Sequence, residues 1–215
     1  MERIVIPTVF AQSKEEFDER FSRIVSVAKY IQIDFMDGKF VKTKGIRIED
    51  VPDLRKYRVR FEAHLMVNRP ERYLDNLKKK GFRKVIFHYE VLKDLDRIKR
   101  LIFEIKKRKI EAWIALNPST HIEKIESILE RIDGVLFMGV HPGREGQKFV
   151  DKVYKNIRKV KKIHKRTKIQ VDGGVNLLNI GKLGKLKVNY VNSGSFIYLA
   201  DDPKRTLGIL ERAFR

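Results

Sequence analysis

The chain has 215 residues, 42% of them hydrophobic and 35% charged, a balance that fits one globular domain and excludes a disordered protein. It contains no cysteine, which excludes disulfides, thiolate zinc sites and a cysteine nucleophile, and without a long apolar run we expect neither membrane insertion nor export. The net charge of +20 at pH 7 favours a phosphorylated partner, and we expect the protein in the cytoplasm.

Short β-branched or apolar runs alternate with charged amphipathic runs along the whole chain, which predicts repeated strand–helix units and a parallel sheet. The pattern predicts eight strands, at residues 3–7, 30–35, 58–65, 84–89, 110–116, 134–139, 168–173 and 189–194. Helical segments are expected at residues 13–29, 69–80, 93–108, 121–131, 148–165 and 203–214. This arrangement favours a single-domain (β/α)8 TIM barrel over residues 1–215 rather than an open doubly wound sheet.

The basic residues are concentrated in the charged runs, for example in KKKGFRK (78–84) and KNIRKVKKIHKR (155–166). Lys and Arg are interleaved there with apolar residues at roughly helical spacing, which is typical of the solvated outer face of an amphipathic helix. No zinc-finger spacing or aromatic RNA-binding motif accompanies the charge, so nucleic acid is not the expected partner.

Polar side chains follow nearly every predicted strand, and the carboxyl ends of barrel strands are where barrels carry their chemistry. Residues two apart on a strand point to the same side, so Gln32 shares a face with Asp34, as His64 does with Met66. We therefore expect Asp34, His64 and Asp172 to converge at the mouth of the barrel. The other side chains expected at strand ends are Thr8, Met36, His88, Asn117, Met138, His141, Ser193 and Ser195.

Several residues near these strand ends have simpler explanations. Asp37 precedes Gly38 and is expected to shape a turn. His88, taken alone, is interpreted as a hydrogen-bonded structural residue. His121 follows NPST at a helix start and His164 lies in a lysine-rich helix, so both are expected at the surface. The methionines could be core filler, although all those beyond the first residue lie next to the polar cluster.

Glycines form a second group, in the last three strand-to-helix loops. They occur in VHPGREGQKF (140–149), VDGGVN (171–176) and NSGSF (192–196), where backbone N–H groups can approach a phosphate closely. Barrels commonly hold a phosphate after their last two strands, so the pattern predicts a phosphate site there. The expected phosphate-binding residues are Gly143, Gly146, Gly173, Gly174, Gly194 and Ser195.

Six motifs in one order carry a resemblance to a known family. They are IDFMDGKFV, HLMVNRPERYLD, VIFHYE, VLFMGVHPGREGQKF, IQVDGGVN and VNSGSFIY. Together they resemble the ribulose-phosphate 3-epimerase family, whose fold is a TIM barrel of the ribulose-phosphate-binding type. The resemblance implies that Asp34 and Asp172 form the acid/base pair, and that a divalent metal (zinc, iron or manganese) is held by them with His64 and one more histidine. It also implies that Met36, Met66 and Met138 surround the reacting carbons.

The chain departs from the family pattern at three places. Gln32 stands where the family has a histidine, and a neutral amide oxygen is a weaker ligand than imidazole, so Gln32 is a doubtful metal ligand. The first strand is followed by Ala11 and Ser13, where the family has Ser and Asp. The phosphate loop carries Arg144 and Glu145, which change its charge.

The resulting hypothesis is an epimerase that interconverts ribulose 5-phosphate and xylulose 5-phosphate by two-carboxylate proton transfer at C3, either metal-assisted or with a weakened metal site. The alternative is a diverged ketose-phosphate-binding barrel with another substrate or a non-catalytic role. A nucleic-acid-binding barrel rests on charge alone. The expected partner is a small phosphorylated ketose, and we expect a homo-oligomer. The substrate-binding residues would be Thr8, Met36, His64, Met66 and Met138.

Overall fold

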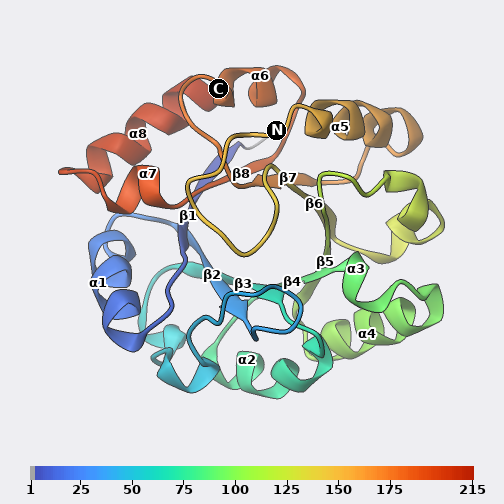
Figure 1. Cartoon of the computed structure of the whole chain (residues 1–215), viewed down its shortest axis with the longest axis horizontal. Helices are drawn as coiled ribbons and strands as arrows, with labels where there is room; N and C mark the ends of the chain where they lie inside the picture. The colour runs from blue at the N-terminus through green and yellow to red at the C-terminus, as the bar shows by residue number, and fades with distance from the viewer. Residues whose placement is uncertain (1–2) are drawn as a thin grey trace.

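The computed structural model describes residues 3–215, which form a closed barrel of eight parallel strands surrounded by helices (Figure 1). Each strand pairs with the next in the chain, and β8 closes the barrel onto β1. The fold class predicted from the sequence is confirmed, and every predicted strand is present within a few residues. The strands are β1 (Ile4–Val9), β2 (Tyr30–Met36), β3 (Arg60–Met66), β4 (Lys84–His88), β5 (Glu111–Leu116), β6 (Gly134–Met138), β7 (Ile169–Asp172) and β8 (Tyr190–Ser193).

The outer layer consists of α-helices and short 3-10 helices that follow the strands (Figure 1). No helix within residues 3–215 is long and apolar enough to cross a membrane. The α-helices are α1 (Lys14–Val25), α2 (Leu74–Lys80), α3 (Tyr89–Leu92), α4 (Leu95–Lys107), α5 (Lys152–Ile163), α6 (Ile180–Lys185), α7 (Ser195–Tyr198) and α8 (Pro203–Phe214). The 3-10 helices are η1 (Ile48–Asp50), η2 (Leu54–Lys56), η3 (Pro70–Tyr73) and η4 (Ile122–Arg131).

Several helical segments differ from the prediction, and the short helices η1, η2, α3 and α7 lie outside the expected ranges. The helix expected at 121–131 is the 3-10 helix η4, whose buried Ile122, Ile125 and Ile128 are spaced by three, the repeat of a 3-10 helix. Helix α6 was not among the expected segments because glycine lowers helix propensity. One of its glycines, Gly184, is required by packing, since a Cβ there would lie 2.5 Å from the carbonyl oxygen of Phe214.

The main hydrophobic core fills the space between the barrel and its helices. Inside the barrel, a smaller apolar cluster around Ile86, Trp113 and Leu136 occupies the side formed by β4, β5 and β6. Gly134 leaves room for Trp113, because a Cβ at that glycine would lie 2.4 Å from the indole ring. The rest of the barrel interior is polar, and its buried side chains include Thr8, Gln32, Asp34, Glu62, His64, Lys84, His88, Gln170, Asp172 and Asn192.

Lys84 is a correction to the sequence analysis. It ends the basic run 78–84, which was expected on a solvated face, but only 4% of Lys84 is exposed. As the first residue of β4 its side chain points into the barrel, where its ammonium lies 3.6 Å from the centre of the Trp113 ring. Strand alternation therefore places a charged residue in the interior, and that charge requires a buried partner.

Candidate active site

A cavity of about 410 Å³ opens at the carboxyl ends of the strands. Most of the residues predicted for the site line it, from strands on both sides of the barrel and from the last three loops. Met36 instead packs beside the cavity against Phe10 and Met66, and Gln32 lies beneath its floor. The predicted residues in the lining are Thr8, Asp34, His64, Met66, Met138, Gly143, Gly146, Asp172, Gly173, Gly174, Gly194 and Ser195.

Asp34, His64 and Asp172 meet at the base of this cavity, as expected. Asp34 and His64 are register partners on β2 and β3, while Asp172 ends β7 on the other side of the barrel. The His64 Nδ1 atom lies 3.1 Å from Asp34 Oδ1 and 3.3 Å from Asp172 Oδ2. One ligand atom from each of the three residues lies within 4.8 Å of the others. Two carboxylates and an imidazole at this spacing fit a divalent metal ion.

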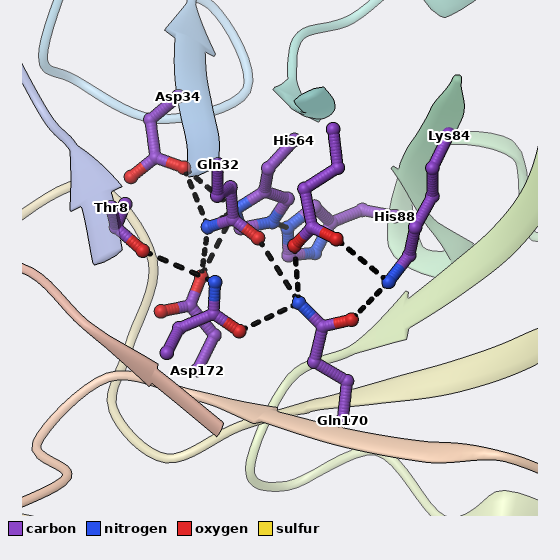
Figure 2. A network of polar contacts seen from close by, with 10 residues as sticks. Thr8, Gln32, Asp34, His64, Lys84, His88, Gln170 and Asp172 are labelled. Atoms are coloured by element: carbon purple, nitrogen blue, oxygen red, sulfur yellow. Dashed lines mark hydrogen bonds and ion pairs between the residues drawn. The ribbon is translucent and has the colours of Figure 1, made fainter. Parts of the chain in front are cut away.

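Gln32 is fully buried, and its amide nitrogen lies between the carboxylates of Asp34 and Asp172 (Figure 2). Its Nε2 atom donates to Asp34 Oδ1 at 3.0 Å and to Asp172 Oδ2 at 2.6 Å, and it lies 3.5 Å from His64 Nδ1. The Gln32 Oε1 atom points the other way and accepts from Gln170 Nε2 at 3.4 Å. In this orientation Gln32 is a hydrogen-bond donor to both carboxylates, and its oxygen faces away from the metal ligands.

His88 lies behind His64 and connects it to a third carboxylate. The two Nε2 atoms are 2.9 Å apart, and the rings stack with centroids 5.1 Å apart. His88 Nδ1 lies 3.3 Å from Glu90 Oε2, and Glu90 also accepts the backbone N–H of Asn117 at 2.8 Å. His88 is thus a hydrogen-bonded residue, as interpreted, but its partner is a site residue. A carboxylate–histidine chain of this kind orients a metal-binding imidazole.

Burial and hydrogen bonding shift the pKa values of the central groups. Burial raises the pKa of Asp34 to about 6, although the hydrogen bond from His64 opposes the shift. Burial alone would lower the pKa of His64, but its hydrogen bonds with Asp172 and Asp34 outweigh that effect and raise the pKa to about 10. Burial also lowers the pKa of His88. A carboxyl group with a pKa near 6 can accept or release a proton close to neutral pH, as a general acid or base requires.

The loops after β6, β7 and β8 form the opposite wall of the cavity. Gly173 and Gly174 have left-handed backbone conformations, with φ of 96° and 68°. A Cβ at Gly173 would also lie 2.4 Å from a methyl carbon of Val140, so a larger residue is excluded there by both strain and space. These loops contribute glycine residues to the cavity lining, together with residues that carry charged side chains, among them Arg144, Glu145 and Lys148. Backbone N–H groups at glycines can approach an anion closely.

The model of the ribulose-phosphate 3 epimerase family matches residues 4–198 of this chain. The chain belongs to this family. It is 37% identical to a ribulose-phosphate 3-epimerase from Helicobacter pylori over 187 residues, covering 84% of each protein. It is also 34% identical to the Bacillus subtilis ribulose-phosphate 3-epimerase, again with 84% of each protein covered. The chain is therefore an isomerase of the epimerase class, which confirms the resemblance recognised from its motifs.

Solved structures outside the epimerases share the same fold. The chain matches a 3-hexulose-6-phosphate synthase from Salmonella typhimurium with a TM-score of 0.74 and 15% identity, covering 98% of each chain. A tryptophan synthase from Mycobacterium tuberculosis matches with a TM-score of 0.72 and 14% identity, covering 100% of this chain and 93% of that chain. At this identity the likeness shows the barrel alone, so the chemistry must be argued from the site.

Glu145, one of the departures from the epimerase pattern, lies in the cavity wall formed by the loop after β6. Its carboxylate accepts the hydroxyl of Tyr198 on α7 at 2.6 Å and lies 3.2 Å from the guanidinium of Arg20 on α1. Burial raises the pKa of Glu145. These contacts tie the loop to two helices and place a carboxylate close to the glycine backbone at Gly194.

The remaining polar residues have the roles expected of them. Asp37 shapes a turn, because its carboxylate accepts the backbone N–H groups of Lys39, Phe40 and Asn68. Ser13 begins α1 by accepting the backbone N–H of Glu16 at 3.2 Å. His121 and His141 are exposed, although His141 also lines the cavity, and His164 is partly exposed beside Thr167.

Proposed function

We propose that this epimerase interconverts ribulose 5-phosphate and xylulose 5-phosphate, with Asp34 and Asp172 as its acid/base pair. The observation that supports this most strongly is the pair of buried carboxylates at the base of one cavity, both within hydrogen-bond distance of His64 Nδ1. They come from β2 and β7, strands that are not neighbours in the barrel. A sugar lying between them would meet one carboxylate on each face.

Inversion at C3 of a 2-ketose needs two proton transfers on opposite faces. The proton at C3 is acidic because it is adjacent to the C2 carbonyl, and its removal leaves a planar enediolate. A single base cannot easily return a proton to the other face, so one carboxylate starts ionised and the second starts protonated. The raised pKa of Asp34, about 6, suits a group that must hold a proton in one direction and accept one in the other.

We propose that Asp34, His64 and Asp172 hold a divalent metal, with zinc, iron or manganese as the candidates. Their donor set fits such an ion, and the chain from His64 through His88 to Glu90 fixes the ring with Nδ1 toward the carboxylates. When bound, the metal supplies positive charge that stabilises the negative charge of the enediolate oxygens. For a metal to bind, His64 must present an unprotonated Nδ1, with its Nε2–H donated to His88.

The other cavity residues would orient the substrate and exclude water from the reacting carbons. The glycine loops at 140–149, 171–176 and 192–196 are placed to bind the phosphate through backbone N–H groups, and that remote binding positions C3. Met66 and Met138 also line the cavity, where an uncharged and polarisable side chain would exclude water without donating a proton. The Thr8 hydroxyl remains the polar contact from β1.

A second candidate is a related ketose phosphate as the true substrate. Glu145 supports it, because a carboxylate in the wall of the predicted phosphate region differs from the pattern of the family. Comparison of kcat/KM across pentulose and hexulose phosphates separates the two candidates. Preference for ribulose 5-phosphate supports the first, whereas a preference for another ketose phosphate supports the second.

The roles of the two carboxylates can be tested by converting each to its amide. Asp34→Asn and Asp172→Asn should each lower kcat for ribulose 5-phosphate by at least about 100-fold, because each removes one proton-transfer group. Turnover should be measured after chelation and again after adding zinc, manganese or iron. Asp133→Asn is the matched control, since Asp133 accepts a backbone N–H at the opposite end of the barrel. Near-normal turnover in either site variant would contradict the proposal.

A further inference from the structure

A chain of buried polar side chains continues below Gln32 into the barrel (Figure 2). The proposed reaction uses none of the side chains in this lower part. Glu62, Lys84, Gln170 and Asn192 are each at most 4% exposed, and they come from β3, β4, β7 and β8. Buried polar groups at this depth are costly unless each has a hydrogen-bond partner, and here each one has.

An ion pair between Lys84 and Glu62 forms the lower end of this row of hydrogen-bonded side chains. The Lys84 ammonium lies 2.9 Å from Glu62 Oε2, and the two residues are register partners on β3 and β4. An ammonium can only donate hydrogen bonds, whereas a carboxylate can only accept them. The ion pair therefore presents one obligatory donor and one obligatory acceptor to whatever lies beside it.

Gln170 bridges both members of this pair. Its Oε1 atom accepts from Lys84 Nζ, and its Nε2 atom donates to Glu62 Oε1. An amide turned by 180° would place its NH₂ group against the ammonium and its oxygen against the carboxylate, and both contacts would be repulsive. The orientation of the Gln170 amide is therefore dictated by charge.

Gln170 passes this orientation on to Gln32. Its Nε2 atom also lies 2.6 Å from Asn192 Oδ1 and 3.4 Å from Gln32 Oε1, so its two N–H groups are shared among three acceptors and the contact with Gln32 is the longest. With its oxygen engaged below, Gln32 directs its nitrogen upward to the carboxylates. Asn192 in turn donates to the Thr8 hydroxyl at 3.1 Å. A hydroxyl both donates and accepts, so Thr8 imposes no direction. The Lys84–Glu62 pair at one end and the two site carboxylates at the other both favour this orientation of the Gln32 amide.

We propose that Lys84, Glu62 and Gln170 are positioning residues that hold the Gln32 amide with its N–H groups toward the two site carboxylates. Gln32 then acts as a donor to Asp34 and Asp172 and is prevented from serving as an oxygen ligand for a metal. The inference rests on the proposed function only in treating those aspartates as the reacting groups and as metal ligands. It predicts a low affinity for divalent cations, because the Gln32 amide directs its N–H groups rather than its oxygen toward the metal ligands.

Two variants should release or reverse this amide. Gln170→Met keeps the length of the side chain and the charge of the barrel but removes the donor to Gln32 Oε1. The exchange Glu62→Gln with Gln170→Glu keeps the buried charge but moves the carboxylate next to Gln32, where it can accept only from the Gln32 nitrogen. In both variants the Gln32 oxygen is free to face a cation.

The test is the affinity of the full chain for Mn²⁺, followed by the electron paramagnetic resonance signal of the free ion. The exchange variant should bind Mn²⁺ at least about tenfold more tightly than the unaltered chain, with Gln170→Met in between. Adding Gln32→Leu to each variant should abolish the gain. A gain that survives Gln32→Leu is a charge effect and contradicts the proposal.

The second readout is the side-chain amide signal of Gln32 in a ¹H–¹⁵N spectrum, assigned by its loss in Gln32→Leu. It should shift in both variants without metal, whereas an unmoved signal with unchanged Mn²⁺ affinity would overturn the proposal. If circular dichroism shows that the exchange variant is unfolded, Gln170→Met decides the question alone, because its ion pair is intact. Neither readout uses turnover, so a failure of the epimerase assignment would be distinguishable.

Discussion

Asp37 shows at the residue scale how a carboxylate next to the site can be structural. It lies three residues after Asp34, but its oxygens accept two backbone N–H groups of the turn after β2, from Lys39 and Phe40, and a third from Asn68 in the loop after β3. Burial alone would raise the pKa of Asp37, and the hydrogen bonds from Asn68, Lys39 and Phe40 outweigh it and lower the pKa. The ionised form of Asp37 is therefore more stable in the folded protein than in the unfolded protein.

This linkage gives a prediction with a defined sign. A carboxyl whose pKa is lowered in the folded state stabilises it above the unfolded pKa of about 4, and the contribution is lost as pH falls through the folded value. Asp37→Ala should lower the free energy of unfolding by about 1–2 kcal/mol at about pH 7, and the difference should shrink as the pH falls below the unfolded pKa of about 4. Urea unfolding at several pH values measures it. A difference that grows on acidification would contradict the account.

Strand alternation places more polar residues beside the site than the sequence motifs contain. Glu62 and Gln170 each lie two residues before a site residue on the same strand, and Lys84 lies four before His88, so alternation predicts that they face the same side. The orientation of the Gln32 amide, by contrast, cannot be predicted from strand alternation. It depends on the ion pair between β3 and β4 meeting Gln170 from β7 across the barrel, and no local pattern carries that contact.

At the level of elements, the loop between β6 and α5 places the carboxylate of Glu145 in the same cavity wall as the glycines proposed to bind phosphate. Glu145 in this loop is paired with Arg20 from α1 and Tyr198 from α7, so three elements meet at one carboxylate. Because Glu145 and the glycine loops line the same cavity, its negative charge opposes a phosphate while it neutralises the nearby guanidinium.

Glu145→Gln should therefore lower KM for ribulose 5-phosphate and lower the inhibition constant of inorganic phosphate, by about threefold to tenfold, with kcat little changed. The amide keeps a hydrogen-bond acceptor for Tyr198 and frees the charge of Arg20. Steady-state kinetics with phosphate as a competitor provides the measurement, and Glu16→Gln, which alters another partner of Arg20, is the control. A raised KM would show instead that Glu145 holds the loop in its binding shape.

The strands were predicted most accurately, because a barrel strand is buried on both faces and its sequence is therefore a nearly continuous apolar run. The strands are apolar runs bounded by charged residues, and each was located within a few residues. The segment 121–131 was expected as an ordinary helix because its isoleucines lie on one face in either helix type, and only their strict spacing of three favours the 3-10 form. The short helix α6 has two glycines and too few turns to show a period.

At the scale of the whole molecule, most of the basic residues behind the net charge of +20 lie on the outer helices and loops around the cavity proposed to bind a phosphate. Long-range attraction of this kind is screened by salt. We expect kcat/KM for ribulose 5-phosphate to fall several-fold between about 10 mM and about 500 mM sodium chloride, through KM, with kcat nearly constant. Steady-state kinetics at fixed pH tests this, and a kcat/KM independent of salt would contradict it. The homo-oligomer stays a prediction.

The central claim, proton transfer at C3 by two carboxylates, is tested most directly by converting ribulose 5-phosphate to xylulose 5-phosphate in D₂O. Carboxylates that exchange with solvent should deliver deuterium, so the account predicts about one deuterium at C3 of each xylulose 5-phosphate formed, detected by NMR and mass spectrometry. Asp34→Asn and Asp172→Asn should form no deuterated xylulose 5-phosphate. Product that retains the original hydrogen at C3, or no exchange at C3 under any metal condition, would contradict the account.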